Sequence, residues 1–172
     1  MLDCNKFETE RTRLRPFGAG DVEALASIYS NPEVTKFLGF DEGSLGRRKR
    51  ELEFWMNSYS RQGHGMLGVV HKENGSLVGR CGFAQWEWDG VQEVELSCVL
   101  QQSLWGQGIA TEVTSVLRDY GFKQIGFSRL VSLLHPENIA SHRVAEKIGM
   151  QFDREVHSIT QSLWMYSLHR KA

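Results

Sequence analysis

The chain has 172 residues, 41% of them hydrophobic, which is enough for one domain with a substantial core. A formal net charge of −1 gives no overall field that would attract nucleic acid or an anionic membrane, and no apolar run approaches the ~20 residues that span a bilayer. Three widely spaced cysteines without a Cys-x-x-Cys motif argue against a disulfide framework or a structural zinc site. We therefore expect a cytoplasmic protein with a single domain over residues 1–172, and neither nucleic acid nor a membrane as a partner.

The beginning of the chain predicts an edge strand followed by a short helix. Residues 8–15 alternate weakly between charged and apolar side chains and end at Pro16, which is typical of an edge strand. Asp21 stands at the position of an N-cap, before an amphipathic stretch over 22–29 that the Asn31-Pro32 dipeptide ends.

A second helix is predicted over residues 44–62. Its basic run, 47–50, is interpreted as a solvated helix face, because Glu51 and Glu53 follow it and the chain as a whole is not basic. Residues 34–40, before this helix, are expected to form a loop or a short helix that packs against the core or walls a pocket.

The middle of the chain predicts an antiparallel meander. Strands are expected over 66–72, 77–86 and 91–100, joined by Asn74-Gly75 and Asp89-Gly90. These two dipeptides favour type I′ hairpin turns. The third strand then leads into the most informative part of the sequence.

That part is a turn with two glycines between the strand residues 94–100 and a helix predicted over 110–123. Gly106 and Gly108 carry no Cβ, so the backbone can turn sharply there and approach a ligand closely. The amides of residues 105–110 then meet at a helix N-terminus, where such groups bind phosphate. Neither the P-loop nor the dinucleotide-binding pattern is present, and a tight connection without a ligand remains the alternative.

The last third predicts a strand over 129–134, a helix over 139–148 and a strand pair over 151–157 and 162–168. The succession of strand, helix and strand implies a right-handed crossover, and therefore a parallel pair between 91–100 and 129–134.

Three motifs in order resemble the GNAT N-acetyltransferase superfamily, and within it the RimJ/RimL-like branch. They are Val94–Leu100, Trp105–Glu112 and Asn138–Met150, and the opening residues 10–16 resemble the same branch. The similarity covers nearly the whole chain. It implies an α/β (α+β) fold with a mixed, mostly antiparallel sheet of six to seven strands, about four flanking helices and a splayed parallel strand pair at the centre.

The resemblance also implies where acetyl-CoA binds. The family pattern Gln/Arg-x-x-Gly-x-Gly/Ala maps onto residues 105–110, and the first position departs from it because it is Trp105. The residues implied to hold the pyrophosphate through this turn are Trp105, Gly106, Gln107, Gly108, Ile109 and Ala110. Val99 and Leu100 are implied to offer main-chain groups to the pantetheine arm.

Two residues of the later helix follow from the same resemblance. By spacing alone Asn138 is a good N-cap and Ser141 an ordinary first-turn residue, whereas in the family these positions approach the pantetheine and the thioester sulfur. Many relatives carry a tyrosine acid four residues after Ser141, where this chain has Ala145, so Ser141 is the candidate acid. Arg143 either neutralises a phosphate of CoA or faces solvent.

The expected reaction is direct attack of a primary amine on the thioester, with Glu95 as the first choice of base and His135 or His157 as alternatives. The acceptor is either a protein N-terminal α-amine or a small-molecule amine, and the protein either a monomer or a homodimer. No metal is expected, because the six histidines lack metal-ligand spacing. A non-catalytic acetyl-CoA-binding module and a phosphate-binding regulatory domain that binds ATP are the competing hypotheses.

Overall fold

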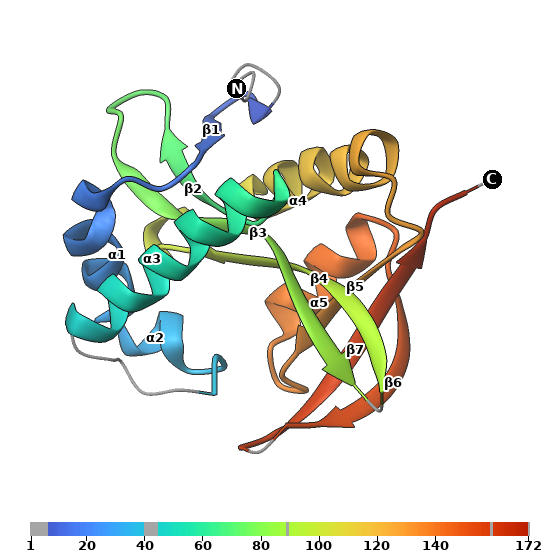
Figure 1. The fold of residues 1–172 in the computed structure, drawn as a ribbon. Coiled ribbons are helices and arrows are strands. Elements are labelled where there is room, and N and C mark those ends of the chain that lie inside the picture. Colours follow the sequence, from blue (N-terminus) through green and yellow to red (C-terminus); the bar gives the residue numbers. More distant parts are fainter. Residues whose placement is uncertain (1–6, 40–44, 89, 159, 172) are drawn as a thin grey trace.

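A computed structural model describes residues 7–39, 45–88, 90–158 and 160–171 (Figure 1). Its centre is a seven-stranded sheet in the order β1-β2-β3-β4-β5-β7-β6. Every neighbouring pair is antiparallel except β4 and β5, which run parallel, as the sequence predicted. The strands are β1 (Thr12–Arg15), β2 (Met66–His71), β3 (Leu77–Trp88), β4 (Val91–Leu100), β5 (Arg129–Leu134), β6 (Gln151–His157) and β7 (Ser162–His169).

Helices cover both faces of the sheet (Figure 1). They are α1 (Val22–Tyr29), α2 (Pro32–Thr35), α3 (Leu45–Gln62), α4 (Ile109–Tyr120) and α5 (Ile139–Lys147), with 3₁₀ turns over Ala19–Asp21 and Gln102–Leu104 and a π-helical turn over Gly121–Ile125. Strand β4 divides its side chains between the two cores: Leu96 and Leu100 pack with α4 and α5, and Val99 with α1 and α3. This alternation is the period of two that a central strand requires.

The parallel pair is joined over a very short length. Glu95 opposite Val131 is its one paired position in the described part of the chain, and the hydroxyl of Ser132 donates to the carbonyl of Leu96 at 2.7 Å. Beyond this point β4 continues to Leu100 and β5 to Leu134 without pairing. At their C-terminal ends the two strands therefore face each other without ladder hydrogen bonds between them.

Four local predictions differ from the structure in part or in full, because the side chain or the turn makes contacts that the local pattern did not show. Asp21 holds the N-cap position of α1, as predicted, but its side chain makes no capping hydrogen bond, since its carboxylate accepts hydrogen bonds from Arg15 at 2.7 and 2.8 Å and from the amide of Gly18. The predicted edge strand shortens to 12–15, because the chain turns back and Glu8 bridges to Arg13.

The third concerns the basic run 47–50, which is not wholly solvated. Arg48 is fully buried, with its guanidinium 4.5 Å from the ring centre of Tyr29 and 2.5 Å from the carboxylate of Glu51. The first predicted hairpin turn also differs: the amide of His71 donates to Ser76, so Asn74-Gly75 lies inside a longer loop. Phe40, Ser44 and Asp89, which belong to predicted segments, lie outside the described residues.

None of the helices in the described ranges is long and apolar enough to cross a membrane. The same ranges contain no group of three His, Cys, Asp or Glu side chains placed to hold a metal ion.

Candidate functional site

A cavity of about 640 Å³ opens where β4 and β5 separate, between the N-terminal ends of α4 and α5 and the segment around α2. Its lining brings together residues from four separate stretches of the sequence. Eleven of the twelve predicted site residues line it: Glu95, Val99, Leu100, Trp105, Gly106, Gly108, Ile109, Ala110, Asn138, Ser141 and Arg143. Gln107 is the exception.

The glycine turn has the backbone conformation that its sequence predicted. Gly106 and Gly108 have φ of +74° and +84°, in the left-handed region that favours glycine, and Gly108 is the N-cap of α4. The backbone N–H groups of residues 106–110 donate no hydrogen bond to any residue that the structure describes. The amide of Trp105 differs, because it donates to the carbonyl of Gln102 at 3.0 Å. Five of the six predicted donors are therefore available to a ligand.

Arg11, directly before β1, contacts this turn, a role that sequence reasoning missed. Its guanidinium donates to the carbonyl of Gln107 at 2.7 Å and forms an ion pair with Glu112 in the first turn of α4. The side chain of Gln107 donates to the carbonyl of Ser103 at 2.9 Å, away from the cavity. Arg11 lies in the opening segment that carried the family resemblance, but nothing local to it pointed to residues nearly a hundred positions later.

The pairing of β3 with β4 decides which main-chain groups of β4 face the cavity. The amide of Gln101 donates to Val78, and Val99 lies opposite Arg80, so the N–H and C=O groups of Val99 point toward β3. Because main-chain groups alternate in direction along a strand, the N–H and C=O groups of Cys98 and Leu100 point toward the gap between β4 and β5. The indole N–H of Trp105 donates to the Leu100 carbonyl at 2.9 Å. Val99 thus contributes its side chain to the cavity, and Cys98 holds the main-chain position predicted for Val99.

Glu95 lies at the point where β4 and β5 separate, with its carboxylate in the cavity lining. The indole N–H of Trp86 on β3 donates to it at 2.6 Å. Burial raises the pKa of the Glu95 carboxyl above its ordinary value, and the hydrogen bond from Trp86, the charge of Arg80 and the Leu133 amide only partly oppose that rise. A carboxylate with a raised pKa is a stronger base than an ordinary one.

Arg80 on β3 contacts β4, the strand that carries Glu95. It is buried, and its guanidinium donates to the hydroxyl of Tyr29 at 2.5 Å and to the hydroxyl of Ser97 at 3.0 Å. Ser97 itself lines the cavity two residues beyond Glu95.

The first turn of α5 presents its predicted residues to the cavity. The side chain of Asn138 caps the helix by accepting from the amide of Ser141 at 3.2 Å, so the N-cap interpretation is correct for Asn138. The Ser141 hydroxyl makes no hydrogen bond within the described ranges. Arg143 is exposed and, one turn later, so is Lys147; both line the cavity, and neither makes an ion pair with a described residue. Lys147 was predicted near the end of the helix and was not among the predicted cofactor-binding residues.

The two alternative bases differ in position. His135 lines the cavity and stacks on Phe37 with ring centres 5.0 Å apart, while its Nδ1 accepts from the amide of Glu137 at 3.2 Å. His157 is exposed on β6, lies outside the cavity lining and contacts Ser162 at 2.9 Å.

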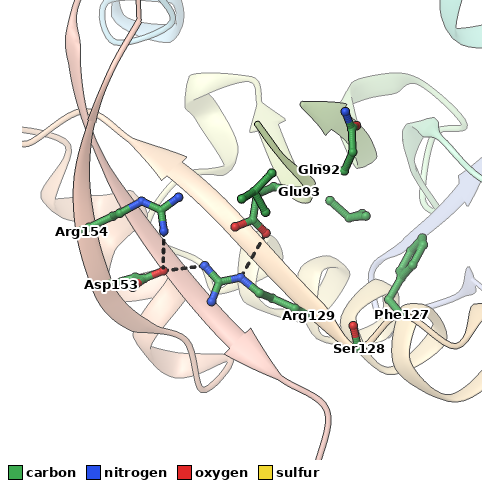
Figure 2. Close-up of a pocket in the computed structure, with 9 residues that line it drawn as sticks. Gln92, Glu93, Phe127, Ser128, Arg129, Asp153 and Arg154 are labelled. Carbon is green, nitrogen blue, oxygen red and sulfur yellow. Dashed lines mark hydrogen bonds and ion pairs between the residues drawn. The ribbon is translucent and has the colours of Figure 1, made fainter. Parts of the chain in front are cut away.

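A second cavity, of about 440 Å³, lies at the other end of β4 and β5 (Figure 2). Arg129 spans it, donating to Glu93 at 3.1 Å and to Asp153 at 2.5 Å, and Asp153 also faces Arg154 at 3.8 Å. None of the predicted site residues lines this cavity. Its charged groups form ion pairs with one another, which favours a structural role.

Taken together, the mixed sheet, the separated parallel strands and the helix N-terminus with available amides define a fold and site of the acetyltransferase class. The comparison with known families agrees: residues 11–151 match the model of the acetyltransferase (GNAT) domain. The chain belongs to the GNAT family of N-acetyltransferases.

Individual proteins support this assignment. The uncharacterized protein YkkB of Bacillus subtilis (strain 168) is 30% identical over 167 residues, which cover 94% of each chain. A crystal structure of an acetyltransferase from Agrobacterium tumefaciens str. C58 superposes with a TM-score of 0.80 and 28% identity, covering 95% of this chain and 93% of that one. RimL, a ribosomal L7/L12 α-N-protein acetyltransferase solved in complex with coenzyme A, has the same fold, with a TM-score of 0.77 at 17% identity and coverage of 94% and 95%.

Proposed function

We propose that this chain transfers the acetyl group of acetyl-CoA to a primary amine, either the α-amine of a protein N-terminus or a small-molecule amine. The observation that carries the proposal is the run of unpaired backbone amides over residues 106–110 at the start of α4. A helix N-terminus contributes ~0.3–1 kcal/mol to binding one exposed anion, so a doubly charged pyrophosphate needs several such amides together. The coenzyme A held by RimL, a protein of the same fold, supports this choice of ligand.

The rest of the cavity suits the remaining parts of acetyl-CoA. The pantetheine arm carries amides that can pair with the main-chain groups of Cys98 and with the amide of Leu100, in the manner of an added strand. The exposed cations Arg143 and Lys147 are placed to neutralise phosphate on the CoA. Asn138 holds the first turn of α5 in place and so positions Ser141.

The acetyl donor supplies the reactive thioester, and the chain must supply a base. A lysine-like amine has a pKa of ~10.4, so about one molecule in 10³ is neutral at pH 7, a handicap of roughly 4–5 kcal/mol. Glu95 removes the proton that the amine loses, directly or through water, and His135 is the alternative within the cavity. Ser141 gives its proton to the departing sulfur.

The test is thiol release from acetyl-CoA against a panel of amines and ribosomal-protein N-terminal peptides. Glu95→Gln and Ser141→Ala should each lower kcat by about 10²–10⁴-fold while leaving the Kd for acetyl-CoA nearly unchanged. Glu137→Gln, which neutralises another carboxylate of the lining, is the matched control and should retain activity.

Two results would overturn the proposal in different ways. Calorimetric binding of acetyl-CoA without thiol release on any amine favours a non-catalytic acetyl-CoA-binding module. Binding of ATP in preference to acetyl-CoA favours a phosphate-binding regulatory domain.

A further inference from the structure

Two cysteines face each other across β3 and β4. Cys81 lies directly opposite Cys98 in the register, and both are free thiols. Because Gln101 donates to Val78, and paired positions alternate along the ladder, Cys81 and Cys98 occupy a non-hydrogen-bonded pair. Such pairs bring their Cα atoms to ~4.5 Å, within the range of roughly 4.4–6.8 Å that disulfides span. The backbone can thus accept a disulfide here.

The two thiols differ in what can reach them. Cys98 is half-buried and lines the large cavity. Cys81 is fully buried in the core under α4, and burial raises the pKa of its thiol well above the ordinary value, with a hydrogen bond to Cys98 acting in the same direction. A reagent dissolved in the cavity therefore meets Cys98 first, and Cys81 can be reached only through Cys98.

We propose that Cys98 is a modification site for low-molecular-weight disulfides, above all coenzyme A disulfide, and that Cys81 is its resolving thiol. In the first step the Cys98 sulfur attacks one sulfur of the reagent, the reagent S–S bond breaks, and the leaving thiolate takes up the proton that Cys98 loses. In the second step the Cys81 sulfur attacks Cys98, the mixed disulfide bond breaks, and the leaving thiolate takes up the proton that Cys81 loses. The reagent is reduced to two thiols, and the cysteine pair is oxidised by the same two electrons.

The consequence for binding rests on the proposed function. A substituent on Cys98 occupies the cavity in which we place the pantetheine arm, so the mixed disulfide should block acetyl-CoA. The second step removes the substituent from the cavity and bonds the Cys98 sulfur to Cys81 on β3. Cys81 therefore protects the cavity from lasting thiol modification.

The experiment follows the masses of both steps in protein that carries Cys4→Ser, because Cys4 lies outside the described residues and would add a third thiol. With coenzyme A disulfide, intact mass and peptide mapping should show an adduct on Cys98. A product then forms that has lost the adduct and two hydrogens and links Cys81 to Cys98, and dithiothreitol should reverse both changes. Further variants separate the steps: Cys81→Ser should stop at the adduct, and Cys98→Ala should give neither product.

Since Cys81 is fully buried, Cys81→Ala is made as well, and the variant with a cooperative unfolding curve is used. Three results would overturn the proposal. One is an unmodified Cys98 in folded protein when the same reagent modifies it in denaturant. The others are an adduct on Cys98 that never proceeds to the linked product, and modification of Cys81 in the Cys98→Ala variant.

Two further measurements separate this proposal from the proposed function. Coenzyme A disulfide should react faster than glutathione disulfide, because the glycine turn would hold its pyrophosphate, and equal rates would contradict the preference for coenzyme A. The isolated adduct of the Cys81 variant should lose acetyl-CoA binding and regain it with dithiothreitol. If the adduct binds acetyl-CoA normally, the placement of acetyl-CoA in this cavity fails while the mapped thiol chemistry stands.

Discussion

A cavity lies at each end of the β4 and β5 pair. The two cavities differ in whether their polar groups are paired with other protein groups. At the N-terminal end the buried carboxylate of Glu93 pairs with Arg129, which also binds Asp153 (Figure 2). At the C-terminal end the amides of residues 106–110 have no partner among the described residues. Polar groups that satisfy one another stabilise a fold, whereas donors left without a partner bind a ligand. Whether the polar groups are paired therefore distinguishes the candidate ligand site from the structural cavity better than volume or charge does.

The largest expected effect comes from Gly108→Val at the C-terminal end. Gly108 has φ of +84°, and a β-branched residue there costs about 1–3 kcal/mol in strain or reorients the amides that follow. We expect the Kd for acetyl-CoA, measured by calorimetry, to rise about tenfold or more.

The matched control is Gly126→Val. Gly126 has nearly the same φ, +89°, but lies outside the cavity lining, so it should lose similar stability without a change in Kd. If both variants weaken binding equally, strain alone explains the loss and the turn has no special role.

The opposite outcome is expected for Glu93→Gln at the N-terminal end. This change leaves Arg129 without its buried anionic partner, so the free energy of unfolding should fall by about 1–3 kcal/mol in urea denaturation. The Kd for acetyl-CoA should stay the same. Glu87→Gln, an exposed carboxylate on the neighbouring strand, should change stability by less than about 0.5 kcal/mol. A Glu93→Gln protein of normal stability that binds acetyl-CoA weakly would reverse the roles of the two cavities.

The smallest effect is a shift in pH dependence with Trp86→Phe. The Trp86 N–H group favours the charged form of Glu95, so its removal should raise the pKa of that carboxyl further. Because the base must be ionised, kcat/KM rises as pH passes upward through this pKa, and the acidic limb should move to higher pH.

Trp88→Phe is the control for this shift, since the indole N–H of Trp88 donates to no described group. It should leave the limb in place. If the acidic limb of kcat/KM stays in place in Trp86→Phe, or moves to lower pH, Glu95 is not the group whose ionisation determines that limb.

Patterns within short stretches predicted most of the architecture. The succession of strand and turn over β2, β3 and β4, the helical spacing of Ile109, Val113 and Leu117, and the order strand, helix and strand after them were enough for the mixed sheet and its parallel pair. The glycine turn was equally local, because positive φ at Gly106 and Gly108 depends on the residues themselves.

The sequence by itself thus determined the elements, their order and the turn with available amides, since these depend on neighbours a few residues apart. Only the tertiary structure decided that Arg48 is buried, that Arg11 braces Gln107, and that Cys81 meets Cys98 beside the cavity. It also decided that Cys98 and Leu100, rather than Val99, direct their main chain toward the gap. Register and burial arise from pairing between distant segments, and a shift of one residue would reverse every such assignment.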